Sequence, residues 1–263
     1  MIRPVHLILL LSACLWLAGC ATTIPTDVDR PVSMAHSDPG ATELGRFFQA
    51  EISAHPGESG VVLVPTGEWG FRARAGLSNQ AEKTIDVQYY IWETDTAGSL
   101  LAERLMRAAD RGVRVRMLVD HVTTKDTDFK FARMTYHPNI EIRVFNPYAN
   151  RSFRTLEFVF GLERLNHRMH NKAFIVDNAI AIVGGRNIGD NYFGVDTAAN
   201  FRDLDLAVVV VPARFVPGVL REVAQKGAGA AIIISGTRFT NSDAVAGGAM
   251  RNAKTSRLPT GCR

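Results

Sequence analysis

The chain contains 263 residues, with a formal net charge of +4 and a pI of about 9.1. Without a short export signal, this length suits one domain of ordinary size with a sizeable core, and the single spare cysteine, Cys262, excludes a fold built on internal disulfide bonds. The mildly basic balance suits contact with anionic phospholipid headgroups or with nucleic acid, and charge alone does not decide between them.

The N-terminus has the pattern of an export signal. A basic start is followed by an apolar run over 5–17 that is too short to span a membrane, and Leu17-Ala-Gly-Cys20 matches a bacterial lipobox. We therefore expect residues 1–19 to be a lipoprotein signal peptide and Cys20 to carry the lipid; a simple cleaved secretion signal is the alternative. Because Ala21 is not an aspartate, we expect a lipid-anchored protein of the bacterial cell envelope, in the outer membrane and facing the periplasm.

Composition divides the rest of the chain into three parts. Residues 20–42 carry three prolines and predict a lipidated tether, and residues 43–211 predict a single folded domain. Residues 212–263 are rich in glycine and alanine and carry no periodic apolar pattern at their end, which marks an atypical tail. A frameshift or premature stop would produce such a tail, as would an unusual native sequence, and we expect truncation.

The periodicity of apolar residues predicts alternating strands and helices in the domain. The expected helices cover 43–53 and 98–110, and the expected strands cover 61–64, 84–92, 113–119, 140–145, 170–176, 179–183 and a segment beginning at 207. Asp177-Asn178 is a turn-favouring pair and predicts a hairpin between two of these strands. The alternation predicts an α/β fold, a mixed sheet flanked by helices on both faces.

A histidine and a lysine open the strand expected at 170–176, in the sequence Met169-His-Asn-Lys-Ala-Phe-Ile-Val-Asp177. Side chains two apart on a strand point to the same face, so an imidazole and an ammonium group are expected side by side. Gly184 and Gly185 would let the backbone approach the ligand, and Lys172 with the amide of Asn187 would neutralise phosphate oxygens. These residue types predict a site for a phosphate ester, and a lysine beside the histidine argues against a bound divalent ion.

The whole pattern, HxKxxxxD followed after six residues by GGRN, resembles the signature of the phospholipase D superfamily. Arg168-Met-His-Asn-Lys172, Gly184-Gly-Arg-Asn-Ile-Gly-Asp190 and the upstream Ile85–Trp92 and Arg111–Asp120 are similar to its cardiolipin synthase branch. The resemblance covers about residues 60–207 and implies one phospholipase D-type half-domain, with no metal and no cofactor.

The resemblance also implies roles for individual residues. His170 would be the nucleophile, Lys172 would bind phosphate and Asp177 would support the site. The nucleophile needs an acid on its other ring nitrogen, and Asp203 stands at roughly the distance at which family members place one; Asp205 is the alternative.

One expected feature is missing from the sequence. Members with two motifs use a second histidine as general acid, but His170 is the only histidine with a lysine two positions later. A single chain would therefore supply half an active site. Either two copies form a homodimer with their motifs facing each other, or the second half has been lost.

These observations predict a phosphatidyltransferase or phosphodiesterase of cardiolipin synthase type. It would act on an anionic phospholipid through a phosphohistidine intermediate, and it would be incomplete as a single chain. The alternatives are a homodimeric single-motif nuclease and an inactive lipoprotein fragment that retains a phosphate-binding pocket. The lipobox and Gln88-Tyr-Tyr-Ile-Trp92 favour lipid over nucleic acid as the partner.

Overall fold

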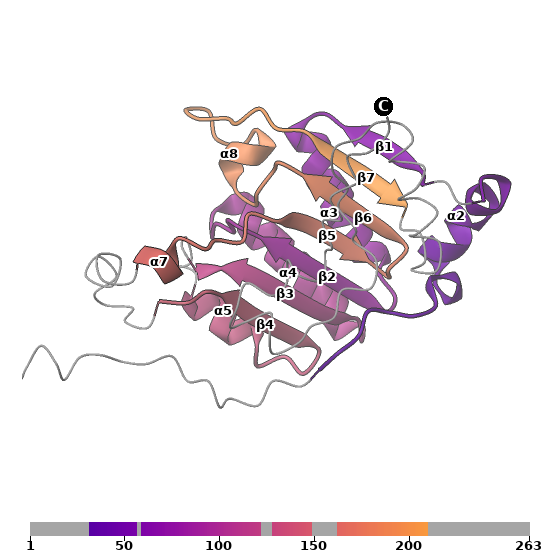
Figure 1. The fold of residues 1–263 in the computed structure, drawn as a ribbon, viewed down its shortest axis with the longest axis horizontal. Helices are drawn as coiled ribbons and strands as arrows, with labels where there is room; N and C mark the ends of the chain where they lie inside the picture. The colour runs from indigo at the N-terminus through magenta and orange to yellow at the C-terminus, as the bar shows by residue number, and fades with distance from the viewer. Residues whose placement is uncertain (1–31, 57–58, 122–127, 149–161, 210–263) are drawn as a thin grey trace, which may run out of the picture.

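A computed structural model describes residues 32–56, 59–121, 128–148 and 162–209 of the chain, and its centre is a single seven-stranded sheet (Figure 1). The strands are β1 (Val61–Val64), β2 (Thr84–Tyr89), β3 (Arg114–Asp120), β4 (Ile140–Phe145), β5 (Lys172–Val176), β6 (Ile180–Gly184) and β7 (Asp205–Val209). Their order across the sheet is β1-β7-β6-β5-β2-β3-β4. Strands β2, β3 and β4 are parallel neighbours and all other pairs are antiparallel, so the predicted mixed sheet is confirmed.

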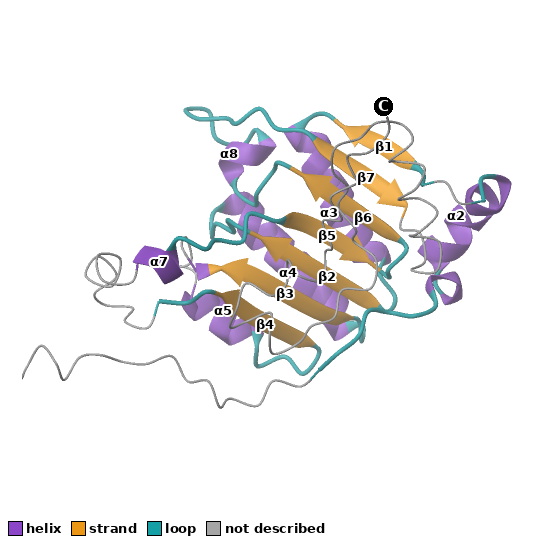
Figure 2. Ribbon diagram, viewed as in Figure 1, coloured by secondary structure: helices purple, strands orange, loops and turns teal. Residues whose placement is uncertain are grey.

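The described helices lie beside and behind this sheet. They are the 3-10 helix η1 (Pro39–Ala41) and the α-helices α2 (Glu43–Ala54), α3 (Gly67–Gln80), α4 (Thr96–Asp110), α5 (Asp128–Met134), α7 (Leu162–Leu165) and α8 (Asp190–Phe193). Helices α3, α4 and α5 lie behind the strands in the view of Figure 2. The α/β class is confirmed, although within the described residues the helices that cover the strands lie on one face rather than on both.

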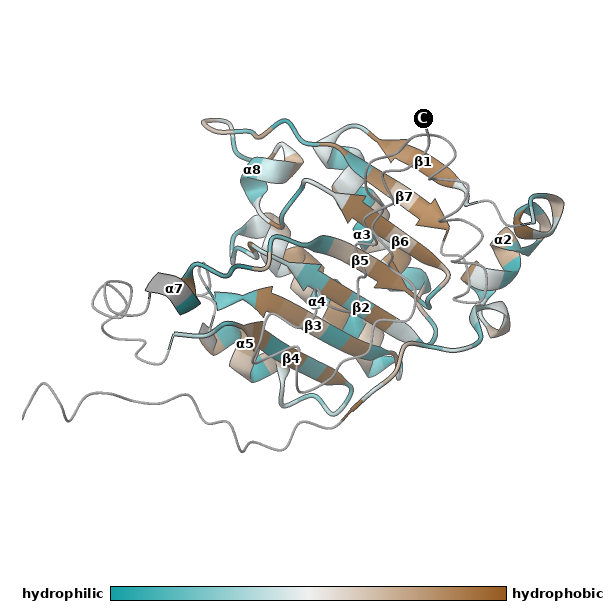
Figure 3. Ribbon diagram, in the orientation of Figure 1, coloured by the Kyte–Doolittle hydropathy of each residue, from teal (hydrophilic) through white to brown (hydrophobic). Residues whose placement is uncertain are grey.

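The main hydrophobic core fills the space between the sheet and helices α3, α4 and α5. Every second residue of the central strands points into it, and on β2 these are Ile85, Val87 and Tyr89, each at most 1% exposed. Strand β5 is buried along its whole length, as expected for a central strand. Strands β1, β6 and β7 are mostly brown in Figure 3, which reflects their aliphatic composition.

Most predicted elements are present, with shifted ends. The helices expected at 43–53 and 98–110 correspond to α2 and α4, and the expected hairpin turn contains Asp177 and Asn178, both at positive φ. One boundary affects the site: β5 begins at Lys172, so His170 precedes the strand instead of opening it. Positions 1–19, Cys20 and 212–263 lie outside the described residues. Within the described residues, no helix combines the length and the apolar character needed to cross a bilayer.

Helix α3 was not predicted, because its most buried positions carry no apolar side chain, and Phe71 and Leu77, which pack against the core, are only partly buried. Gly70, Arg74 and Ser78, spaced four residues apart, are its buried positions. Thr66 caps the helix by accepting a hydrogen bond from the backbone N–H of Trp69. The Arg74 side chain is fully buried and reaches the sheet below the candidate site.

Candidate functional site

His170 and Lys172 lie where parallel strands β2 and β3 end and antiparallel β5 begins. Lys172 pairs with Tyr89, the last residue of β2, and its ammonium group donates a hydrogen bond to the backbone oxygen of His170 at 3.0 Å. His170 is exposed whereas Lys172 is only 8% exposed. The structure therefore brings the two predicted residues together, with the imidazole toward solvent and the ammonium group held behind it.

The environment of His170 favours the neutral imidazole. Partial burial, and after it the charge of Lys172, lower the pKa of His170 below its usual value of 6.5. Burial also lowers the pKa of Lys172, and the negative charge of Asp203 works in the opposite direction. A neutral imidazole has a free lone pair for attack on phosphorus, and the adjacent cation suits the negative oxygens of a phosphate ester.

Asp120 anchors the chain immediately before the histidine. Its buried carboxylate accepts a hydrogen bond from the Met169 N–H at 2.9 Å and forms an ion pair with Arg168 at 2.9 Å. The Arg168 guanidinium also donates to the backbone oxygens of Leu165 and Asn146 and lies 5.5 Å from the Tyr148 ring centroid. These contacts fix the segment that immediately precedes His170 at the end of the sheet.

Asp203 lies in the site but does not contact the imidazole. A Cβ atom placed on Gly185 would collide with its carboxylate, so that glycine allows Asp203 to approach, and the Asp203 charge acts on Lys172. Among the described residues, no carboxylate forms a hydrogen bond with the His170 ring. The structure thus places Asp203 with Lys172 and does not pair it with the nucleophile as the sequence had suggested.

Asp205, the alternative orienting acid, is buried in a different network. Its carboxylate pairs with Arg74 at 3.0 Å and with Arg186 at 3.3 Å, and all three side chains are at most 3% exposed. Arg74 also donates to the Tyr89 hydroxyl at 2.9 Å, and Arg186 donates to the backbone oxygen of Asp203. The network links α3, β2 and β7 beneath the site and holds Asp203 in place. Sequence reasoning missed Arg74 because helix α3 was not predicted, so nothing placed this arginine at a buried position.

Asp177 lies at the opposite end of β5 from His170. The strand separates Asp177 from Lys172 by about 16 Å, at a rise of roughly 3.3 Å per residue. Its fully buried carboxylate accepts three backbone hydrogen bonds, from Glu82, Lys83 and Thr84, at 3.0, 2.7 and 2.8 Å. The structure does not bring Asp177 together with the other predicted site residues. Instead, the Asp177 carboxylate connects the loop before β2 to the hairpin of β5 and β6.

The glycine-rich turn after β6 is occupied by contacts within the protein. A Cβ atom on Gly184 would collide with the backbone of β7, which explains why a glycine is required there. The Asn187 side chain accepts a hydrogen bond from the Ile91 N–H at 3.1 Å and donates one to the Tyr192 hydroxyl at 3.0 Å. Both ends of this amide are therefore engaged, and it holds the chain after β2 in place.

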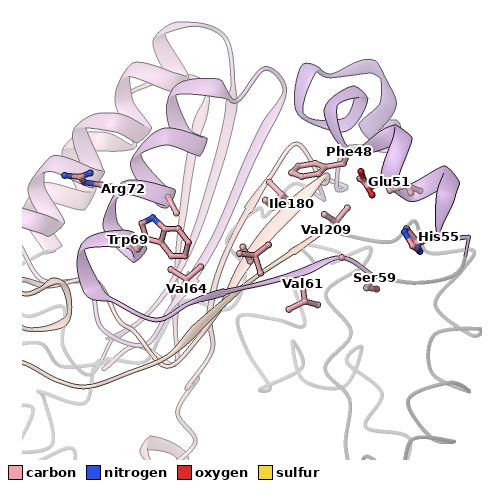
Figure 4. A pocket seen from close by; sticks show the side chains of 15 residues that line it. Phe48, Glu51, His55, Ser59, Val61, Val64, Trp69, Arg72, Ile180 and Val209 are labelled. Carbon is pink, nitrogen blue, oxygen red and sulfur yellow. The ribbon is translucent and has the colours of Figure 1, made fainter.

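An apolar cavity of about 820 Å³ lies at the other end of the sheet, between α2, α3 and β1 (Figure 4). Ile180 and Val209, at the ends of β6 and β7 remote from Gly184 and Asp205, contribute to its walls. None of the predicted site residues lines this cavity. In the described part of the chain, no group of three His, Cys, Asp or Glu side chains is placed to hold a metal ion.

The sequence is similar to one known protein family and to several known proteins. Residues 77–216, more than half of the chain, match the family described as "Cardiolipin synthase, PLD-like domain". Cardiolipin synthase C of Escherichia coli is 46% identical over 157 residues, which cover 60% of this chain and 33% of that protein. The major cardiolipin synthase ClsA of Bacillus subtilis is 29% identical over 165 residues, again 60% of this chain and 33% of that protein.

The solved structure of NucT from Helicobacter pylori has a TM-score of 0.42 at 14% sequence identity and covers 64% of this chain and 92% of that one. The chain spans about one third of the length of the curated relatives that it matches. With the family model matching residues 77–216, the chain belongs to the phospholipase D superfamily, in its cardiolipin synthase-like branch.

Proposed function

We propose that this chain carries a half-site for phosphatidyl transfer of the cardiolipin synthase type, with His170 as the nucleophile and Lys172 as the phosphate-binding cation. The observation that carries the proposal is the pairing of an exposed imidazole of lowered pKa with a largely buried ammonium group. The family supports phospholipid chemistry in general, and the relatives named above are cardiolipin synthases.

In the first step, an imidazole nitrogen of His170 attacks the phosphorus of an anionic phospholipid such as phosphatidylglycerol. A bond forms between nitrogen and phosphorus, and the bond between phosphorus and the headgroup oxygen breaks. The headgroup leaves as glycerol after taking up a proton, and a phosphatidyl-histidine remains. Lys172 neutralises the phosphate oxygens during this displacement, and Asp203 stabilises the charged form of Lys172.

In the second step, a hydroxyl oxygen attacks the same phosphorus, the bond between phosphorus and the His170 nitrogen breaks, and the hydroxyl proton returns to the group that protonated the leaving headgroup. When the hydroxyl belongs to a second phosphatidylglycerol the product is cardiolipin, and when it belongs to water the product is phosphatidic acid. Two phosphatidylglycerol molecules thus give one cardiolipin and one glycerol. The imidazole is the nucleophile in the first step and the leaving group in the second. One difficult displacement is thereby replaced by two easier ones.

The proton for the leaving headgroup would come from a second histidine on a facing half-site. Among these 263 residues His170 alone has a lysine two positions later, so the facing half-site would come from another copy of the chain or from a missing second half. If another copy supplies it, specific activity should rise with protein concentration.

The proposal includes the placement of the protein. Residues 1–19 would be removed, Cys20 would carry the lipid, and residues 20–42 would tether the domain at 43–211 to the periplasmic face of the outer membrane. Such an anchor would keep the site close to its lipid substrate. Mass spectrometry of the N-terminal peptide from the membrane fraction tests this part: a diacylated Cys20 supports it, and an unmodified or uncleaved N-terminus contradicts it.

The transfer assay uses the full chain, vesicles of phosphatidylglycerol, and mass spectrometry of the lipid products. We expect cardiolipin and glycerol from the wild type and no product from His170→Ala or Lys172→Ala. Lys83→Ala, an exposed lysine at the Asp177 end of the sheet, is the matched control and should retain full activity. Turnover in His170→Ala, or no product from the wild type at any protein concentration, would contradict the proposed function.

A further inference from the structure

An aromatic ring packs beside the His170 imidazole. The Tyr90 ring lies against it, with a distance of 4.8 Å between ring centroids and an angle of 55° between ring planes. The Lys172 nitrogen lies 5.5 Å from the centroid of the same tyrosine ring. The Tyr90 ring therefore contacts both the imidazole and the ammonium group that the proposed chemistry uses. Within the described residues, no carboxylate forms a hydrogen bond that would orient the imidazole.

The backbone on either side of Tyr90 is held in place. Tyr89, immediately before it, is fully buried and accepts a hydrogen bond from Arg74 at 2.9 Å. Ile91, immediately after it, donates its N–H to the side-chain oxygen of Asn187 at 3.1 Å. Asn187 is itself 3% exposed and is bonded through its nitrogen to the Tyr192 hydroxyl. A ring mounted on such a segment can define the position of a neighbouring side chain.

We propose that Tyr90 is a positioning residue, whose ring holds the imidazole of His170 and the ammonium group of Lys172 in the geometry for attack on phosphorus. Asn187 acts one step further away, because it holds the backbone that carries Tyr90. The proposal rests on the proposed function for the meaning of that geometry, but the contact itself can be tested without any activity.

The Tyr90 ring holds the His170 imidazole and the Lys172 ammonium group for different physical reasons. His170 is exposed and precedes β5, so without a neighbour its imidazole could rotate freely among its rotamers. A packed ring removes most of those rotamers by steric exclusion, and aromatic rings attract each other in tilted arrangements. Lys172 is attracted by the negative face of the same ring, which keeps its charge near the imidazole. Both the packing against His170 and the attraction of Lys172 come from the ring and not from the hydroxyl group. The variant Tyr90→Phe should therefore retain both.

The test of geometry is nuclear magnetic resonance of histidine-labelled protein. Protons near an aromatic face are displaced by its ring current, so the His170 ring protons report directly on Tyr90. His170→Ala identifies those signals among the seven histidines. We expect Tyr90→Phe to leave them displaced and Tyr90→Leu to return them toward the values of a free histidine. Tyr136→Leu, a tyrosine that is 87% exposed, is the matched control and should resemble the wild type.

The transfer assay with the same variants tests whether the contact affects turnover. A misplaced nucleophile lowers turnover more than binding, so Tyr90→Leu should lower kcat by about 10-fold to 100-fold with little change in KM. Tyr90→Phe should restore most of the lost kcat. Unchanged His170 signals in Tyr90→Leu would overturn the contact, and full kcat in a variant whose signals have moved would overturn the positioning role. If the wild type makes no product, the proposed function fails, and the resonance measurement still decides whether Tyr90 holds the imidazole.

Discussion

The two ends of strand β5 carry residues of the same HxKxxxxD motif, yet they have opposite physical characters. At one end His170 is exposed, precedes the strand and contacts an aromatic ring. At the other end Asp177 is fully buried, and its carboxylate accepts three backbone hydrogen bonds. The contrast teaches that closeness of residues in a motif does not mean a shared site. The strand between them is a rigid spacer that links the proposed reactive end, at His170, to the structural end, at Asp177.

The largest difference between the two ends should be in stability. Asp177→Ala leaves three backbone N–H groups without their partner and puts alanine at a φ of 52°, so we expect a loss of about 3–5 kcal/mol in the free energy of unfolding. His170→Ala should change it by less than about 0.5 kcal/mol, because the side chain is exposed.

Urea unfolding of both variants measures the difference. Asp177→Asn is the matched variant, because asparagine tolerates the positive φ and keeps one acceptor oxygen. It should fall between the wild type and Asp177→Ala. Equal stability of Asp177→Ala and His170→Ala would contradict the claim that only the Asp177 end of β5 is structural.

The second largest effect should come from the network beneath the site. Arg74→Met removes the bonds to Tyr89, Gly70 and Asp205 and leaves a buried carboxylate with one cation instead of two. We expect a loss of about 3 kcal/mol in the free energy of unfolding. Arg72→Met on the same helix, which removes an exposed pair with Glu68, should cost less than about 0.5 kcal/mol. Similar unfolding midpoints for the two variants would show that the buried network contributes little.

A smaller effect is expected for a neutral hydrogen bond near the reactive end. Tyr192→Phe removes the partner of the Asn187 nitrogen and retains the ring, so we expect a loss of about 1 kcal/mol in the free energy of unfolding. The ring of Tyr192 stacks with Phe201, and this contact should survive in the variant. A loss as large as that of Arg74→Met would mean that Asn187 has a greater structural role than one hydrogen bond.

The most local effect should be on the titration of His170. The charge of Lys172 contributes to lowering the pKa of His170, after burial, so Lys172→Met should raise that pKa toward its ordinary value. Since attack requires the neutral imidazole, the lowered pKa of His170 in the wild type keeps its reactive form present at lower pH. Nuclear magnetic resonance titration of His170 measures the change, with Lys83→Met as the control. A pKa that falls in Lys172→Met would contradict the electrostatic account.

Much of this fold could be predicted from the sequence, because most of its elements carry an apolar period. Helices α2 and α4 and the hairpin of β5 and β6 follow directly from such patterns. Helix α3 was not predicted, since its buried positions are Gly70, Arg74 and Ser78, and its apolar residues are only partly buried against the core. A polar stripe is informative only when its buried partners, here Tyr89 and Asp205, are already known.

The candidate site could be predicted in its chemistry but only partly in its geometry. The pairing of His170 with Lys172 follows from a spacing of two residues, whereas the partners of Asp177 lie more than 90 residues earlier in the chain. The contact between Tyr90 and His170 likewise joins residues at the ends of two strands, β2 and β5, that are distant in sequence. Such contacts are set by strand register, which no local pattern reveals.

The central claim is that His170 at the reactive end of β5 becomes covalently bound to the phosphatidyl group. The most direct measurement is peptide mass spectrometry of the full chain after brief incubation with phosphatidylglycerol and quenching at alkaline pH, where a phosphohistidine survives. The account predicts one phosphatidyl adduct on the peptide that contains His170, absent in His170→Ala and still present in Lys83→Ala. Product formation without that adduct, or an adduct on another residue, would contradict it.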